Sequence, residues 1–133
     1  MGSVTSAASL TVRPATPEER VDVLSVLDAA MLETDAGALA DRIAADSVLV
    51  AVAEERVLGA VEVREEPPGG HIEAVAVRRN RRGQGIGTRL LQRAYERWQP
   101  LSATFDLAVA PFYEKQGFDV RQVLPERGHG VKR

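Results

Sequence analysis

The chain has 133 residues, a length that suits one domain with its own hydrophobic core, and it contains no cysteine, which excludes disulfides and cysteine-based zinc sites. Its apolar fraction of 44% and charged fraction of 27% are those of a soluble globular protein, and its two histidines do not suggest a histidine-rich metal site, so we predict no metal. The net charge of −2 hides an asymmetry: residues 1–66 carry 13 acidic and 5 basic side chains, whereas residues 67–133 carry 6 acidic and 12 basic ones, which predicts an anionic ligand on the C-terminal half.

The start of the chain lacks the features of a secretory signal. Its first ten residues, MGSVTSAASL, have neither a basic start nor an apolar stretch. No apolar run approaches the ~20 residues that are needed to span a bilayer. We therefore expect a cytoplasmic protein without a membrane partner, with a flexible leader over residues 1–9 and a single domain over residues 10–133.

A helix-start signal and β-branched runs define the elements of the N-terminal part. Thr16 suits a helix cap, with Pro17 at the first helical position and Glu19 at the third. Apolar residues then follow at helical spacing, and β-branched runs come after them. The predicted elements are a strand over 10–13, helices over 17–31 and 36–45, and strands over 47–54, 57–64 and 71–77.

The C-terminal part alternates helices and strands. A glycine-rich segment is followed by a helix that starts at Ile86 and stops before Pro100. The later predicted elements are a strand over 101–106, a helix over 108–116, a last strand over 118–124 and at most a stub near 130–132. This order, β-α-α-β-β-β-α-β-α-β, predicts a mixed α/β sheet with helices on both faces.

The most informative segment is Arg78–Thr88, RRNRRGQGIGT, which a predicted strand enters and a predicted helix leaves. Its glycines allow a tight turn and a close approach of the backbone to a ligand. The first turn of the helix adds unpaired N–H donors and the positive end of a dipole. Four of its residues are arginines that add positive charge. The combination predicts a pocket for a pyrophosphate.

Spacing excludes two common phosphate loops. A Walker loop needs Gly-Lys-Ser/Thr, and this segment has no lysine. A dinucleotide fingerprint needs a third glycine where this chain has Thr88 or Leu90. A glycine-rich turn with solvated arginines remains as the plain alternative.

Two segments resemble the landmarks of one family. Residues 82–87, RGQGIG, match the Q/R-x-x-G-x-G/A signature of the GNAT family of N-acetyltransferases, and residues 111–118, PFYEKQGF, look like that family's F-Y-E-K-x-G-F segment. The two segments come in the same order and at a similar distance as in the family, and the predicted order of helices and strands extends the resemblance to most of the chain. It implies a mixed, mostly antiparallel sheet of about six strands flanked by four helices. It also implies an N-acetyltransferase that moves an acetyl group from acetyl-CoA to a primary amine by direct attack.

The resemblance further implies which residues hold acetyl-CoA. Backbone N–H groups of the loop would bind the phosphates, and the end of the preceding strand would pair with the pantetheine arm. The cofactor-binding residues predicted in this way are Val75, Ala76, Val77, Arg82, Gly83, Gln84, Gly85, Ile86, Gly87, Thr88, Asp106 and Phe112. Many family members have asparagine at the position of Asp106, and an ionised aspartate can only accept hydrogen bonds, so this contact departs from the family's pattern.

Acetyl transfer needs a base for the substrate ammonium and an acid for the CoA thiolate. The family's acid is often the tyrosine of the second landmark, here Tyr113. The family's strand glutamate falls at position 71, where this chain has His71, a competent base at neutral pH. Glu73 lies two residues on, on the same strand face, and would act through a water, orient His71 or bind the substrate's cation. The alternatives are a packing role for Tyr113 and an idle, partly exposed His71.

The predicted acceptor is a small-molecule or peptide amine. The acidic first half favours a cationic acceptor, and the exposed sheet edge left by a short tail favours a homodimer. Two other functions stay open: an acyl-CoA-binding sensor without catalysis, and a nucleic-acid-binding module built on the arginines. Aromatic residues make up only 5% of the chain, and glycines interrupt the arginine cluster, so we expect no nucleic-acid partner.

Overall fold

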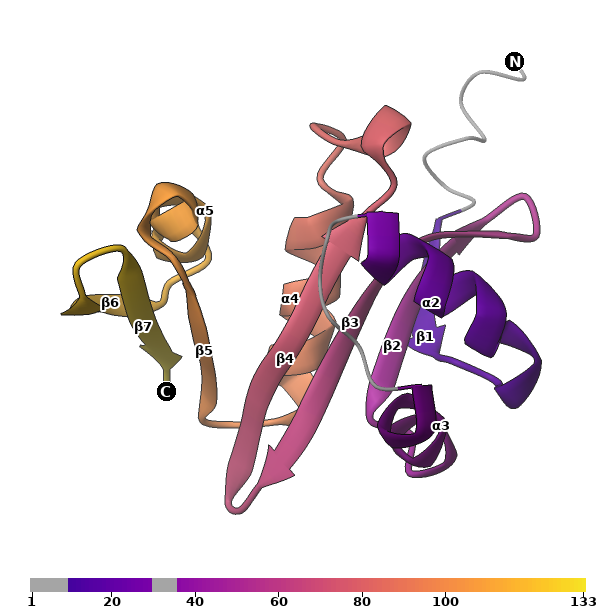
Figure 1. Cartoon of the computed structure of the whole chain (residues 1–133), viewed down its shortest axis with the longest axis horizontal. Helices are drawn as coiled ribbons and strands as arrows, with labels where there is room; N and C mark the ends of the chain where they lie inside the picture. The colour runs from indigo at the N-terminus through magenta and orange to yellow at the C-terminus, as the bar shows by residue number, and fades with distance from the viewer. Residues whose placement is uncertain (1–9, 30–35) are drawn as a thin grey trace.

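The computed structural model describes residues 10–29 and 36–133, and Figure 1 shows its elements. The N-terminal elements are β1 (Thr11–Pro14), the short 3-10 helix η1 (Pro17–Glu19), α2 (Arg20–Ala29), α3 (Ala36–Ala44), β2 (Val48–Ala53), β3 (Arg56–Glu66) and β4 (Gly69–Val77). The C-terminal elements are η2 (Arg79–Arg81), α4 (Ile86–Arg97), β5 (Leu101–Asp106), η3 (Leu107–Val109), α5 (Ala110–Lys115), β6 (Asp119–Leu124) and β7 (Arg127–Lys132). The predicted leader and the last two residues of the predicted first helix lie outside the described residues.

The strands form one seven-stranded sheet in the order β1-β2-β3-β4-β5-β7-β6. All neighbours are antiparallel except β4 and β5, which run parallel. Those two strands pair only between Gly70–Ile72 and Leu101–Ala103. Figure 1 shows them meeting at their lower ends and diverging upward. The sheet is therefore continuous at one end of this pair and open at the other.

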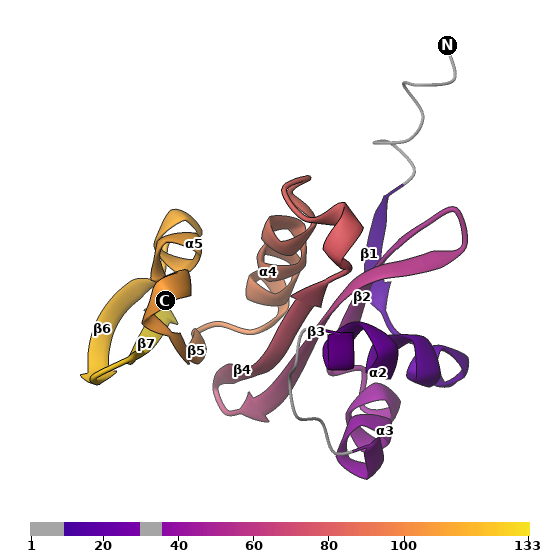
Figure 2. The same cartoon turned by 45° about the horizontal axis from the view of Figure 1, so that its top comes forward.

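Two apolar clusters lie on opposite faces of the sheet. One joins α4 and α5 to the sheet through residues such as Leu90, Phe105 and Phe118. The other joins α2 and α3 to β2, β3 and β4. Figure 2 shows α2 and α3 on one side of the strands and α4 on the other. Among the described residues, no helix is long and apolar enough to cross a membrane.

The first helical segment starts as its sequence predicts. Pro17 opens η1, and the backbone N–H of Thr16 donates to Oε1 of Glu19 over 2.9 Å. Arg13 of β1 holds the same carboxylate through two hydrogen bonds of 2.9 and 2.8 Å, and these bonds lower the pKa of Glu19. The N-terminal end of this segment is thus fastened to the edge strand of the sheet.

The tail departs from the prediction. Instead of one strand and a stub, residues 119–132 form β6 and β7, and β7 lies between β5 and β6. Glycines take its inward positions: an added Cβ would lie 2.9 Å from Phe105 at Gly128 and 3.2 Å from it at Gly130. The alternating apolar pattern of a half-buried strand is therefore absent from the sequence of β7. The mixed, mostly antiparallel fold with four helices is confirmed, with a seventh strand added.

Candidate active site

The glycine-rich loop connects η2 to α4 and is exposed from Arg82 to Gly85. Gly83 and Gly85 have φ angles of 80° and 81°, and an added Cβ would meet nothing within 4 Å at either position. The glycines are therefore required by the path of the backbone, and the space beside them is open. α4 then starts at Ile86 without a side-chain cap. The N–H groups of its first turn are thus available to an anion.

The positive charge around this loop is not neutralised by acidic neighbours. Among the described residues, none of Arg78, Arg79, Arg81 or Arg82 forms an ion pair. Two of them also support the backbone: Nε of Arg78 donates to a carbonyl of β3 over 2.7 Å, and Nε of Arg82 donates to a carbonyl of β4 over 3.3 Å. In the part of the chain that is described, the guanidinium groups of Arg79 and Arg81 make no such contact and are free to meet a phosphate.

The end of β4 leads from the loop to its junction with β5. Beyond Ile72 the strand continues to Val77 without a partner on its β5 side among residues 10–29 and 36–133, while its other edge stays bonded to β3. Val75 and Val77 are partly buried and pack against the α4 cluster. The strand predicted to pair with pantetheine therefore presents an open backbone edge.

α5 and the residue after it lie against the first turn of α4. An added Cβ at Gly87 would lie 3.3 Å from the ring of Phe112, and Nε2 of Gln116 donates to Oγ1 of Thr88 over 3.0 Å. Two predicted cofactor residues, Thr88 and Phe112, are thereby brought beside the loop. Asp106 instead caps η3, because its carboxylate accepts a hydrogen bond of 3.1 Å from the backbone two residues on. Gln116 was not among the predicted cofactor residues, because it stands at the variable position of the landmark segment 111–118.

His71 lies at the junction of β4 with β5. Its register partners are Arg64 on β3 and Ser102 on β5, and its Nδ1 is 2.8 Å from Oγ of Ser102. Burial lowers the pKa of His71, and the positive charge of Arg64 lowers it further against the opposing effect of nearby carboxylates. At neutral pH the imidazole is therefore uncharged, the form that accepts a proton.

Glu73 is placed by a β-bulge. The register between β3 and β4 shifts beside it, so that Glu73 has no partner on β3. Its carboxylate lies 2.6 Å from a guanidinium nitrogen of Arg64 and 4.0 Å from one of Arg42. Arg42 also pairs with the buried carboxylate of Glu62. Among the described residues Glu73 and His71 share no hydrogen bond, so the structure brings Glu73 to two arginines rather than to the histidine.

Tyr113 lies in α5 with 5% of its surface exposed. Its ring stacks on Phe105 with 4.0 Å between centroids, and it meets Phe112 and Phe118 edge-on at 5.3 Å. Burial raises the pKa of Tyr113 to about 12. The ring thus packs among three phenylalanine rings, and the hydroxyl keeps a proton to donate at neutral pH.

A residue that sequence reasoning missed, His129, lies close to His71. Thr104 of β5 is the register partner of His129 on β7, and its Oγ1 is 3.3 Å from Nδ1 of that histidine. The rings of His71 and His129 are 6.3 Å apart between centroids. The lack of a strand signal in β7 concealed this neighbour, and the only clue in the sequence was the presence of a second histidine.

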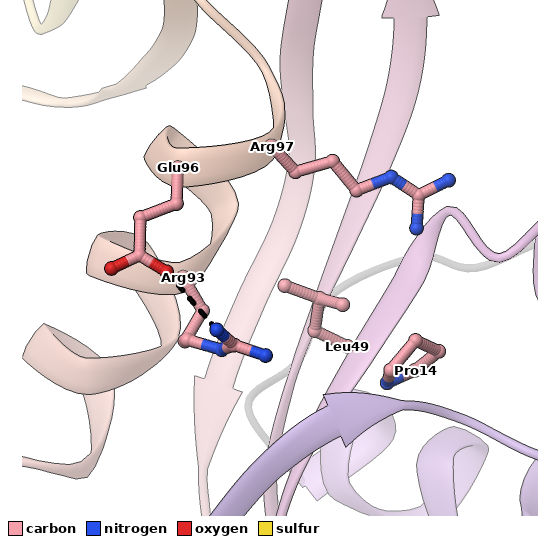
Figure 3. A pocket seen from close by; sticks show the side chains of 5 residues that line it. All are labelled: Pro14, Leu49, Arg93, Glu96 and Arg97. Atoms are coloured by element: carbon pink, nitrogen blue, oxygen red, sulfur yellow. Dashed lines mark hydrogen bonds and ion pairs between the residues drawn. The ribbon is translucent and has the colours of Figure 1, made fainter.

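A separate hollow of about 250 Å³ lies between α4 and the strands β1 and β2. Figure 3 shows its lining by Pro14, Leu49, Arg93, Glu96 and Arg97. Its charged groups are already engaged, because Arg93 pairs with Glu96 at 3.1 Å and Arg97 donates to the backbone carbonyl of Asp46. It shares no residue with the loop or the β4–β5 junction. Across residues 10–29 and 36–133, no group of three or more acidic or histidine side chains is placed to hold a metal.

Comparison with known proteins gave a family match and structural matches. Residues 44–120 match the model described as an acetyltransferase (GNAT) domain. Comparison with curated proteins found no match.

Three solved structures illustrate the similarity of fold. Ard1 from Thermoplasma volcanium has a TM-score of 0.80 at 17% identity, over 94% of this chain and 97% of that one. The PaiA N-acetyltransferase from Thermoplasma acidophilum, solved with coenzyme A, has a TM-score of 0.80 at 15% identity, over 94% and 99%. The diaminobutyrate acetyltransferase EctA from Paenibacillus lautus, solved with L-2,4-diaminobutyric acid and coenzyme A, has a TM-score of 0.73 at 13% identity, over 92% and 93%.

Proposed function

Because the chain belongs to the acetyltransferase (GNAT) domain family, we propose that it transfers the acetyl group of acetyl-CoA to the nitrogen of a primary amine. The observation that carries the proposal is that the open edge of β4, the glycine loop and the uncapped start of α4 come in this order along the chain, with only η2 between the strand and the loop. Coenzyme A is bound in two of the structurally similar enzymes, PaiA and EctA, which supports acetyl-CoA as the co-substrate.

Acetyl-CoA supplies the acetyl group as a thioester, and the chain's own residues bind and orient it. The loop glycines and the first turn of α4 offer backbone N–H groups to the phosphates, and Arg79 and Arg81 add free positive charge. The open edge of β4 suits the amide groups of the pantetheine arm, as a further strand would. The residues proposed to hold it are Val75, Ala76, Val77, Arg82, Gly83, Gln84, Gly85, Ile86, Gly87, Thr88 and Phe112.

We propose His71 as the base that takes a proton from the substrate ammonium. Its Nδ1 faces Ser102, no described residue bonds to its Nε2, and its lowered pKa keeps it uncharged at neutral pH. Glu73 is the weaker candidate, because its carboxylate contacts Arg64 and Arg42, and accepting a proton would disrupt both contacts.

We propose Tyr113 as the acid that protonates the departing thiolate. Its pKa of about 12 means that the phenol still carries its proton at neutral pH. The aromatic rings packed around it hold its ring in one orientation, which is what a proton donor aimed at a fixed sulfur requires.

The acceptor proposed here is a small-molecule or peptide amine. The surplus of acidic residues in the first half favours a cation, yet carboxylates of β3 and β4 are paired: Arg42 binds Glu62, and Arg64 binds Glu66 and Glu73. An acceptor would therefore meet these carboxylates as members of ion pairs and not as free anions.

For the pairing of two copies, the proposed surface is the edge strand β6.

Binding and turnover test the proposal in two steps. Acetyl-CoA should raise the melting temperature of the protein by several degrees, whereas duplex DNA at equal concentration should not, because binding to the folded state alone stabilises it. Release of the CoA thiol should then be measured with a panel of primary amines. No thermal shift with acetyl-CoA would sink the proposal, and a shift without turnover on any amine would favour a sensor.

A further inference from the structure

His71 has a second imidazole beside it. His129 lies on β7, and the two rings are nearly parallel, with 15° between their planes and 6.3 Å between their centroids. They are the only two histidines of the chain. The strand between them, β5, carries the small side chains of Ser102 and Thr104 at these positions, which leaves the rings room to approach each other.

A hydroxyl of β5 holds each ring. Nδ1 of His71 lies 2.8 Å from Oγ of Ser102, and Nδ1 of His129 lies 3.3 Å from Oγ1 of Thr104. If each Nδ1–H donates to its hydroxyl, Nε2 is the nitrogen that takes a proton in both rings. The two histidines are therefore held in the same way, each through its Nδ1 by a hydroxyl of one short stretch of β5.

We propose that His129 is a positioning residue for the reaction at His71, limiting the rotation of that ring and, when charged, opposing a second proton on it. The proposal rests on the role of His71 as the base. Two imidazolium charges at this distance repel each other, so the pair takes up its first proton more readily than its second. A base that resists protonation by solvent stays available to the substrate ammonium.

His129 differs from the other charged groups around His71. Arg64 and Glu66 face His71 from β3 and Glu73 from β4, and Arg64 binds both carboxylates, at 2.9 and 2.6 Å. Arg42 of α3 reaches Glu73 from the far side. Of these neighbours, His129 alone has a ring that lies nearly parallel to that of His71.

Two substitutions distinguish the effect of the ring of His129 from the effect of its charge. His129→Phe keeps a ring of similar size and removes the charge, whereas His129→Lys carries a permanent charge. Because the chain has only two histidines, their imidazole C–H signals can be followed by NMR as the pH changes and assigned with His71→Asn. A unit charge at 6.3 Å in a water-like dielectric shifts the titration midpoint of the neighbouring group by about half a pH unit.

The titration midpoint of His71 should rise in His129→Phe and fall in His129→Lys, with about half a pH unit between the two variants. Arg127→Gln, two residues before His129 on the same strand, is the control and should move the titration midpoint of His71 much less. The acid limb of kcat/KM should move in the same direction as the midpoint in each variant. These paired shifts support the proposal.

An unchanged midpoint in both His129 variants, with acetyl transfer intact, would overturn the proposal and leave the proposed function standing. A midpoint that moves while the acid limb does not would overturn both the positioning role and the choice of His71 as base. Absence of acetyl transfer in the wild-type protein is the separate outcome that rejects the proposed function.

Discussion

The side-chain amide of Gln116 donates a hydrogen bond to the hydroxyl of Thr88, with 3.0 Å between Nε2 and Oγ1. The bond joins the residue after α5 to the first turn of α4, beside the proposed phosphate site. Gln116→Ala should therefore weaken acetyl-CoA binding about fivefold, equivalent to roughly 1 kcal/mol for a neutral hydrogen bond, with little change in kcat. Calorimetric titration measures the affinity. Gln122→Ala, which removes a bond to the exposed carbonyl of Pro125, is the control, and equal affinities in both variants would contradict the expectation.

Gly85 gives a test of the loop's backbone path. At a φ of 81°, alanine should cost about 1–2 kcal/mol and turn the first N–H groups of α4 away from their present direction. We expect Gly85→Ala to lose most of its affinity for acetyl-CoA. Gly117→Ala, at a φ of 91° beyond the end of α5, has the same backbone cost and serves as the matched control. If both variants bound acetyl-CoA alike, the loop would not be the phosphate site.

The pair of Arg42 and Glu62 should matter for stability. Glu62 is buried, and replacing Arg42 by Leu leaves its carboxylate without this partner. Because Arg42 is partly exposed, the expected loss is roughly 2 kcal/mol of unfolding free energy, below the range for a fully buried pair. Urea denaturation measures it, and Arg42→Leu combined with Glu62→Gln should recover much of the loss. A double variant no more stable than Arg42→Leu would argue against the pairing.

Tyr113→Phe separates proton donation from packing. The phenylalanine ring keeps the stack on Phe105, so the melting temperature and the acetyl-CoA affinity should change little. Loss of the acid should lower kcat by about 100-fold, the lower end of what a positioned proton donor contributes. Tyr95→Phe, whose ring lies under the ammonium of Lys132 at 4.3 Å, is the control for removing a phenol elsewhere. Unchanged turnover in Tyr113→Phe would leave the residue with its packing role alone.

His71 and Glu73 can be distinguished by pH as well as by substitution. The pKa of His71 lies below its ordinary value of 6.5, so the base stays uncharged above that pH and is lost as the pH falls through the lowered value. The acid limb of the kcat/KM profile should therefore have its midpoint below pH 6.5. His71→Gln should remove this acid limb together with most of the activity, whereas Glu73→Gln should keep it. The opposite result would make Glu73 the base.

Local chemistry explains which parts of the fold could be predicted. The start at Pro17, the apolar spacing of α4 and the β-branched runs of β2 and β3 are signals carried within each segment, and the structure confirms those elements. The two landmark segments likewise led to the right family, which the match over residues 44–120 confirms. A cytoplasmic location and a homodimer stay predictions.

The glycine turn at residues 82–85 and the helix after it could be predicted from the chain alone, because left-handed backbone and free N–H groups follow from residue type and order. The surroundings of the candidate base could not, because they depend on how distant strands pack. β7 packs through the absence of side chains at Gly128 and Gly130, which no periodic pattern records, and it brings His129 to His71 from a distance of 58 residues along the chain. The contact of Glu73 with Arg64 could not be predicted either, because Arg64 lies on another strand. The register between two strands, including the bulge at Glu73, depends on the packing of the whole sheet.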